Sequence, residues 1–369
     1  MNRSQKRLIS LIAIAGLAVG ASACASLGKP AAPGEGKIGG ELNILVMPGY
    51  EEEQIIRPFE EEFGVKVNAR IYPSSDEMWA MVSASGGSEW DVITPDTPWI
   101  ERLVEADLVE PIDESSLPAL KDYYPAWQNF DQVYVDDQMY GVVSRWGYYG
   151  IVYNHDHVSE EEAQSFEVLW NPKYKDKIVL FDWYLPNMGI ISRGMGNQAP
   201  YDIDEAALGE LREKVLSLRP QVNNIAPTNA DVIQAMANES SWISLGGEWL
   251  QVLLAEDGLP ISVTVPKEGG VSWTEAISIM KNAQNPEAAQ AYLEYMTRPE
   301  VQAKLAWAEA FRTTVPNSKA AEHLTEEQRE LLHIQTPEQA NAILENVATR
   351  DIPEDEKAWQ QIWNDFKAG

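Results

Sequence analysis

The feature that most constrains the fold of this chain is a regular alternation of strand-like and helix-like segments between residues 42 and 94. Apolar runs with β character occupy residues 42–46, 65–72 and 90–94. Between them lie an amphipathic helical pattern that ends at Gly64 and a second helical pattern over residues 76–84. This order predicts an α/β fold in which a mostly parallel sheet is flanked by helices on both faces.

The same alternation continues along the chain, which is long enough for two lobes. Further strands are predicted at residues 178–181, 242–245 and 261–265, and further helices at 205–218, 231–237, 286–296, 299–310, 325–332 and 355–366. Ligands of parallel sheets bind beyond the carboxyl ends of the strands. Two such ends are the turn at residues 48–50 and the segment 95–99, so both are candidate binding segments.

The N-terminus has the pattern of an export signal. Three basic residues precede the apolar run 8–20, and small residues follow at 21–23, which predicts a signal peptide over residues 1–23. Cys24, the only cysteine, comes next and has no partner for an internal disulfide. Residues 16–24 resemble a bacterial lipobox, so we expect Cys24 to be lipidated and residues 24–40 to form a flexible tether; ordinary cleavage with an unmodified Cys24 is the alternative.

The charge of the chain excludes some partners. It has 28 basic and 57 acidic residues, and three of the basic ones lie in the signal peptide. Such an acidic surface repels nucleic acid and anionic membranes, so no nucleic-acid partner is expected and the membrane is reached through the lipid anchor only. The acidity either attracts cations or only keeps an exported protein soluble, and charge alone does not decide between the two.

Several segments together resemble the spermidine/putrescine-binding family of type II periplasmic ABC-transporter solute-binding proteins. The similarity runs in the same order from about residue 41 to residue 320. It rests on residues 41–45, 59–67, 90–95, 168–178, 265–275, 298–301 and 315–317. The resemblance implies a two-lobed clamp that closes on a small solute by hinge bending and is then recognised by a permease in the inner membrane.

The resemblance also implies where the chain crosses between the lobes. Crossings are expected near residues 144–147, 271–276 and 311–316. Lobe 1 is predicted to contain residues 41–145 and 275–315, and lobe 2 residues 146–274 and 316–369. The protein is expected in the periplasm or cell envelope, exported and lipid-anchored at Cys24.

A polyamine site needs aromatic walls for the methylenes and carboxylates for the ammonium groups. Trp273 and Glu275 fall where the family has a Trp-x-Asp pattern, which makes them the first candidates. The alternative is that Trp273 packs in the hinge and Glu275 is solvated. Further candidates lie in or near the two strand-end segments, in the first crossing and in the second lobe: Tyr50, Asp96, Thr97, Trp99, Trp146, Asp182, Trp183, Glu248 and Trp249. For Tyr50 and Trp99, packing in the lobe is an equal alternative.

The sequence leaves the chemical class of the solute open. The resemblance favours a small polyamine-like cation. Arg145 and Arg312 lie in two of the crossings, and if both faced the cleft they would favour a zwitterion or an anion, such as an amino acid or an aminophosphonate. Pairing with nearby acids is the other interpretation of these arginines. A thiamine-like cation is a further alternative, and presentation of a ligand to a sensor is the alternative to import.

No catalytic or cofactor motif is present in the sequence. It has no Gly-x-Ser-x-Gly elbow and no phosphate-binding glycine loop, so we expect neither an enzyme nor a cofactor. His155 and His157 are the only histidine cluster, and their surroundings favour an exposed strand edge over a metal site. Tyr148 and Tyr149 are neighbours on a predicted strand and point opposite ways, so they do not form a metal-ligand pair.

Overall fold

The computed structural model describes residues 37–334 and 336–369. The predicted signal peptide, Cys24 and most of the predicted tether lie outside the described residues. The last tether residues already belong to the folded body, because the N–H groups of Ile38 and Gly39 both donate to the carbonyl of Phe63.

The first lobe is built on three parallel strands, β1 (Glu41–Val46), β2 (Lys66–Ile71) and β3 (Val92–Ile93), with β1 in the middle. Helices α1 (Glu53–Phe63), α2 (Ser75–Ser85) and α3 (Ile100–Glu105) connect and cover them. Helix α1 forms because its apolar residues share one face, from which Ile55 and Phe59 are fully buried. It ends at Gly64, whose φ of 67° is the left-handed conformation that glycine adopts without strain.

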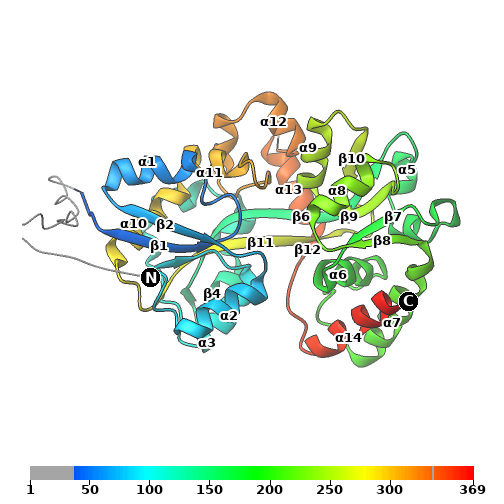
Figure 1. Ribbon diagram of the computed structural model, residues 1–369, viewed down its shortest axis with the longest axis horizontal. Coiled ribbons are helices and arrows are strands. Elements are labelled where there is room, and N and C mark those ends of the chain that lie inside the picture. Colours follow the sequence, from blue (N-terminus) through cyan, green and yellow to red (C-terminus); the bar gives the residue numbers. More distant parts are fainter. Residues whose placement is uncertain (1–36, 335) are drawn as a thin grey trace, which may run out of the picture. The chain divides into compact units, whose positions relative to one another are not determined.

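Two long antiparallel strands, β6 (Val142–Asn154) and β11 (Gly270–Ile279), join the lobes. Every residue of both strands is buried. One end of β11 pairs with β3 of the first lobe, and the far end of β6 pairs with β9 and β10 of the second. One ten-stranded sheet therefore passes through both lobes, with the strand order β2-β1-β3-β11-β6-β9-β7-β8; β10 pairs with β6 and β12 with β11 (Figure 1).

The second lobe repeats the parallel arrangement. Its strands are β7 (Ile178–Phe181), β8 (Val222–Ala226), β9 (Ile243–Gly246) and β10 (Ile261–Thr264). Strand β7 pairs in parallel with both β8 and β9. The helices of this lobe are α6 (Tyr184–Gly194), α7 (Glu205–Leu218), α8 (Asn229–Ala237) and α9 (Glu248–Glu256).

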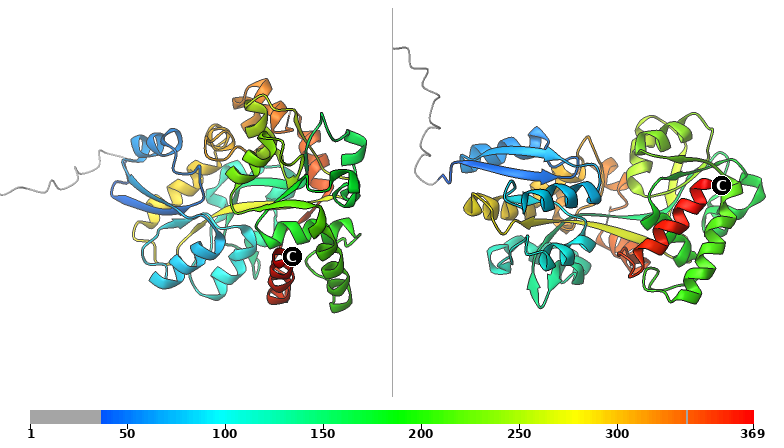
Figure 2. Two further views of the ribbon diagram at one scale, coloured as in Figure 1. Left: turned by 45° about the vertical axis from the view of Figure 1, so that its right-hand side comes forward. Right: turned by 60° about the horizontal axis from the view of Figure 1, so that its bottom comes forward.

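The C-terminal third returns to both lobes. It contains α10 (Pro286–Thr297), α11 (Pro299–Ala306), α12 (Glu326–Leu331), α13 (Pro337–Glu345), β12 (Val347–Thr349) and α14 (Glu356–Ala368). Helices α10 and α11 pack in the first lobe, whereas α14 packs against α6 and α7 in the second (Figure 2). Short elements complete the described chain: α4 (Pro125–Gln128), β4 (Tyr134–Val135), β5 (Gln138–Met139) and α5 (Glu160–Ala163).

The predicted α/β class with two lobes is confirmed, and most predicted elements are present. The prediction was wrong for the end of α11, which stops at Ala306 and not at residue 310. It expected β6 and β11 only as crossings, and it missed α3, α6, β8, the first two residues of α8, α9, α13, β12 and the short elements α4, β4, β5 and α5. Among the described residues, none of the helices has the combination of length and apolarity needed to cross a bilayer.

The apolar core divides near the two crossings. Tyr148 and Ala276 belong to the core of the first lobe, whereas Tyr149 and Trp273 belong to that of the second. Residues 316–369, predicted to lie in lobe 2, are shared: Ala320 to Ala340 contribute to the first core and Trp359 to Phe366 to the second. The exact lobe boundaries stay a prediction.

The close approach of β10 to β6 gives a test of this sheet. A Cβ atom at Gly150 would lie 2.2 Å from the carbonyl oxygen of Thr264, which is backbone and cannot turn away. We expect Gly150→Ala to lower the free energy of unfolding by about 1–3 kcal/mol, measured by urea denaturation.

Gly209 provides the matched control for that substitution. It lies within α7, and a Cβ there would meet no atom within 4 Å. Gly209→Ala should leave stability unchanged or raise it by up to about 1 kcal/mol, because alanine favours a helix interior. Equal effects of the two substitutions would contradict the described contact between β6 and β10.

Candidate functional site

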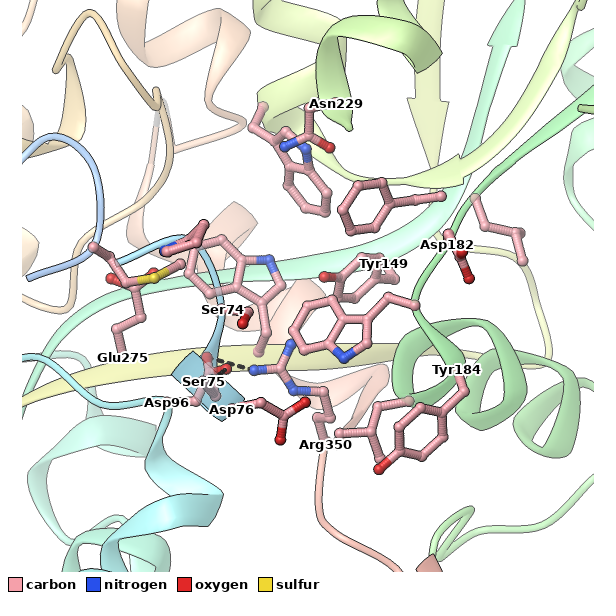
Figure 3. Close-up of a pocket in the computed structure, with 18 of the residues that line it drawn as sticks. Ser74, Ser75, Asp76, Asp96, Tyr149, Asp182, Tyr184, Asn229, Glu275 and Arg350 are labelled. Atoms are coloured by element: carbon pink, nitrogen blue, oxygen red, sulfur yellow. Dashed lines mark hydrogen bonds and ion pairs between the residues drawn. The ribbon is translucent and has the colours of Figure 1, made fainter. Parts of the chain in front are cut away.

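A cavity of about 390 Å³ lies between the lobes. Its wall includes residues that directly follow strand ends, namely Met47 after β1 and Asp182 after β7, together with Asp96 beyond β3. This is the position expected for a ligand of parallel α/β lobes. Figure 3 shows side chains from both lobes and from the crossings directed toward this space.

Aromatic side chains form one side of the cavity. Trp249 and Phe311 are stacked with ring centroids 5.8 Å apart, and Trp273 meets both edge-on at 5.9 and 5.6 Å. Tyr149 meets Trp249 edge-on at 5.0 Å. Trp99 and Trp183 also line the wall. Mutual edge-to-face contacts fix these rings in place, so the cavity offers preformed apolar and π-rich surfaces.

Glu275 lies in the cavity wall but is already paired. Its Oε2 atom accepts hydrogen bonds from Nη2 and Nε of Arg145 at 2.7 and 2.9 Å, and from the hydroxyl of Tyr50 at 3.0 Å. The side chains of Arg145 and Glu275 are only 1% and 3% exposed. Burial raises the pKa of Glu275, and the Arg145 guanidinium opposes that rise.

The backbone explains why these two side chains meet. Arg145 on β6 is the register partner of Glu275 on β11, and the register shifts by a bulge directly after Glu275. The Tyr50 ring lies 4.5 Å from the guanidinium carbon and covers it, while the carbonyl of Pro48 accepts a hydrogen bond from Nη1 at 2.9 Å. The ion pair is therefore enclosed by the turn that follows β1.

Asp96 forms a second ion pair, with Arg350. The Nη2 atom of Arg350 lies 2.5 Å from Oδ1 of Asp96, and the hydroxyl of Ser75 donates to Oδ2 at 2.7 Å. The guanidinium carbon lies 4.6 Å from the ring centroid of Trp183. Arg350, next to Asp96 in Figure 3, thus connects a carboxylate of the first lobe with an indole of the second.

Three more carboxylates lie in the cavity wall. Asp182 accepts from Nε1 of Trp363 at 2.8 Å and lies 3.1 Å from the ammonium of Lys367. Glu356 is paired in the same way, with Arg102 at 3.0 Å and the Tyr184 hydroxyl at 2.7 Å.

Asp76, at the start of α2, is the exception among the wall carboxylates. No basic side chain of the described chain lies within ion-pair distance of it. The wall therefore combines acids that are mostly compensated with one that is not.

Seven of the eleven residues predicted to bind the ligand line the cavity: Asp96, Trp99, Asp182, Trp183, Trp249, Trp273 and Glu275. Tyr50, Thr97, Trp146 and Glu248 do not. Tyr50 is fully buried behind Glu275, and the Thr97 hydroxyl donates to Gln132 at 2.7 Å. Trp146 is fully buried against Trp127, and its Nε1 donates to the carbonyl of Val315, because residue 146 faces the core of the first lobe.

Glu248 begins α9 behind the aromatic wall and is fully buried. Its Oε1 accepts from the Thr313 hydroxyl at 2.7 Å, while Oε2 has no hydrogen-bond partner in the part of the chain that the structure describes. Burial raises the pKa of Glu248 to about 7, although the Thr313 hydroxyl acts in the opposite direction. This carboxyl joins the second lobe to the segment that carries Phe311 and Thr313.

Both arginines that left the ligand class open are paired with acids. Arg145 is paired with Glu275, and Arg312 lies 3.2 Å from Glu256 and over the ring of Trp307. The expectation that they pair with acids is confirmed.

Sequence reasoning missed Arg350, Phe311, Asp76 and Glu356 as wall residues and treated Tyr149 only as a metal-ligand candidate. None of them lies in a motif that marks it. The histidine cluster is placed away from the cavity: His157 stacks on Trp242 with centroids 4.2 Å apart, and no group of three or more His, Cys, Asp or Glu within the described ranges is arranged to hold a metal.

Glu248 gives a pH-dependent prediction. A carboxyl whose pKa is higher in the folded state contributes stability that is fully present below about pH 4.5 and is lost as the pH rises through about 7. Glutamine mimics the protonated form and does not ionise. The free energy of unfolding of Glu248→Gln, relative to that of the unsubstituted protein, should therefore rise by roughly 2–3 kcal/mol as the pH increases from 5 to 8. Urea denaturation across this range measures the difference, and the exposed Glu210→Gln serves as control. A difference that does not change with pH would contradict the raised pKa.

Comparisons with known proteins agree with this geometry. The spermidine/putrescine-binding periplasmic protein 1 of Haemophilus influenzae is 28% identical over 278 residues, covering 74% of each chain. A putrescine-binding periplasmic protein of Escherichia coli is 23% identical over 376 residues and covers 96% of this chain and 98% of its own. The resemblance to the spermidine/putrescine-binding family is thereby confirmed.

Solved structures show the same fold. A putative spermidine/putrescine ABC transporter protein from Listeria monocytogenes matches with a TM-score of 0.75 and 24% identity, covering 89% of this chain and 98% of its own. A spermidine/putrescine substrate-binding protein from Streptococcus pneumoniae matches with a TM-score of 0.76, 22% identity and the same coverage. The sequence profile described as "Bacterial extracellular solute-binding protein" matches residues 54–330, three quarters of the chain. The chain is therefore a member of the bacterial extracellular solute-binding protein family.

Proposed function

We propose that this protein is the extracytoplasmic solute-binding component of an ABC importer and that it captures a small cationic amine of the polyamine type. One observation carries the proposal: a cavity between two lobes whose wall combines several aromatic faces with five carboxylates and one arginine. Relatives named for spermidine and putrescine binding support it, since they match this chain over most of its length.

The chemistry of the wall suits an aliphatic ammonium compound. The indoles of Trp99, Trp183 and Trp273 present surfaces on which methylene groups are removed from water. Their ring faces also attract an ammonium group, each good contact being worth about 0.5–2 kcal/mol. A carboxylate in the wall then compensates the buried charge, because an unpaired buried ammonium is costly.

Binding between the lobes links capture to a change of shape. A solute that touches Trp99 of the first lobe and Trp249 of the second gains contacts only when the lobes are close, so it stabilises the closed form. The closed form is then the one that a membrane permease recognises. Export by the signal peptide and a lipid on Cys24 would hold the protein in the periplasm or cell envelope, near that permease.

The alternatives receive less support from the site. Arg145 and Arg312, which favoured an anion or a zwitterion, both bind acidic partners of the protein itself. No contact in the cavity specifically favours a thiamine-like cation or a sensory role.

Substitution of Trp273 tests the proposed binding mode. Trp273→Leu keeps an apolar side chain but removes the π face, so we expect the dissociation constant for an aliphatic ammonium solute to rise about 2–30-fold. Trp273→Phe should lose less affinity, and Trp170→Leu, which lies outside the cavity, should bind with unchanged affinity. Isothermal titration calorimetry with putrescine, spermidine and their amino-alcohol and amino-acid analogues provides the measurement. The proposal fails if none of these ammonium compounds binds the unsubstituted protein.

A further inference from the structure

Arg350 occupies the kind of place that an ammonium group of a solute would take. A carboxylate, Asp96, lies 2.5 Å from its Nη2 atom on one side, and the Trp183 ring lies 4.6 Å from its guanidinium carbon on the other. The Arg350 side chain is only 3% exposed. A carboxylate together with an aromatic face is the pair of features that recognises an organic cation, and here the protein fills it with its own side chain.

The backbone holds Arg350 in that place. It directly follows β12, which pairs in parallel with β11 through residues 347–349. The Arg350 N–H donates to the carbonyl of Ser272, at a distance of 3.0 Å. Arg350 also lies beyond residue 330, the last residue that the family profile matches.

The charges of the cavity wall also favour a solute with few ammonium groups. Of the five wall carboxylates, Asp96, Asp182, Glu275 and Glu356 each have a basic partner within 3.1 Å, and Asp76 has none in the described part of the chain. A solute with one ammonium group matches this balance. A second ammonium would have to be buried against carboxylates that are already compensated and near the positive guanidinium, which is unfavourable.

The guanidinium of Arg350 also indicates which chemical group the other end of the solute carries. It faces the cavity (Figure 3) and carries five N–H donors, of which the ion pair places only those of Nη2 beside Asp96. A buried N–H donor without an aligned acceptor is costly, and an oxygen atom of the solute would satisfy it.

We propose that Arg350 takes the place of one solute cation, so that the preferred solute carries a single ammonium group and, at its other end, an oxygen acceptor instead of a second ammonium. This inference rests on the proposed function as a binding protein for aliphatic ammonium solutes, and it departs from the polyamine type only in the group at the second end of the solute. Arg350 is then a residue that determines specificity, because it rejects diamines and favours compounds of similar length with an alcohol or carboxylate end.

Matched linear compounds test this directly. Diamines, amino alcohols and ω-amino acids of four to six carbons differ only in the group at one end; putrescine, 4-amino-1-butanol and 4-aminobutyrate are the shortest set. In calorimetry with the unsubstituted protein, we expect an oxygen-bearing compound to bind at least about ten-fold more tightly than the diamine of the same length.

Two substitutions of Arg350 sharpen the test. Arg350→Gln frees Asp96 for a solute ammonium, so the preference should shift toward the diamine by at least about ten-fold, whereas Arg350→Lys keeps the charge and should keep rejecting the diamine. Arg57→Gln removes an exposed positive charge away from the cavity and should leave the preference unchanged. Thermal melting of each variant establishes that it is folded, and the ratio measured with the unsubstituted protein does not depend on any variant.

The outcomes separate this inference from the proposed function. If a diamine or spermidine binds the unsubstituted protein as tightly as the oxygen-bearing compounds, the inference is overturned and the proposed function stands. If Arg350→Gln leaves the preference unaltered, the inference is likewise overturned. Preference for the amino alcohol identifies a neutral acceptor and preference for the amino acid an anionic one, and both support it. If no ammonium compound binds, both the inference and the proposed function are wrong.

Discussion

The pairing of β6 with β11 is the interaction on which the rest of the structure depends. Every residue of these two strands is buried, and the pair connects β3 of the first lobe to β9 and β10 of the second. Both lobes therefore share one sheet, and residues of the shared strands line the cavity between them. Because Glu275, Trp273 and Tyr149 belong to this pair, part of the cavity wall is attached to two fully buried strands. A change in the register of β6 and β11 would alter the cavity and both cores at once.

The acidity of the chain acts differently inside the cavity and on the surface. Glu275 and Asp96 are nearly fully buried, and each lies beside a guanidinium that compensates its charge. The partners come from distant parts of the sequence, Arg145 from β6 and Arg350 from the segment after β12. A buried pair of this kind contributes little net stability, but removal of one partner would leave a costly unpaired charge. The pairs are therefore better understood as fixing the position and charge of the cavity wall than as strengthening the fold.

The fold was predictable from local patterns, whereas the site was predictable only in part. Strand-helix alternation identified the parallel lobes, and strand ends correctly pointed to Asp96 and Asp182. Resemblance supplied Trp273 and Glu275, but whether a carboxylate is free or paired depends on a partner that is far away in sequence. Trp146 illustrates the other limit: it neighbours Arg145 on a crossing strand, yet alternate residues of a strand face opposite sides, and its indole lies in the first core. Strand β12 was missed because it is only three residues long, and α13 and Arg350, on either side of it, were missed as well.

The C-terminal segment connects the crossing strand β11 to the cavity wall. After α12 and α13, the chain returns to β11 as β12, places Arg350 between Asp96 and Trp183, and continues into α14, which packs in the second lobe. Glu356, at the start of α14, binds Arg102 of the first lobe at 3.0 Å, so this segment contacts both sides of the cavity within a few residues. A movement of the lobes must stretch or preserve these contacts, and the charge that a solute brings decides which of them it can replace. On the proposal that Arg350 replaces a solute cation, selectivity for the solute and the energy of closure depend on the same few ion pairs.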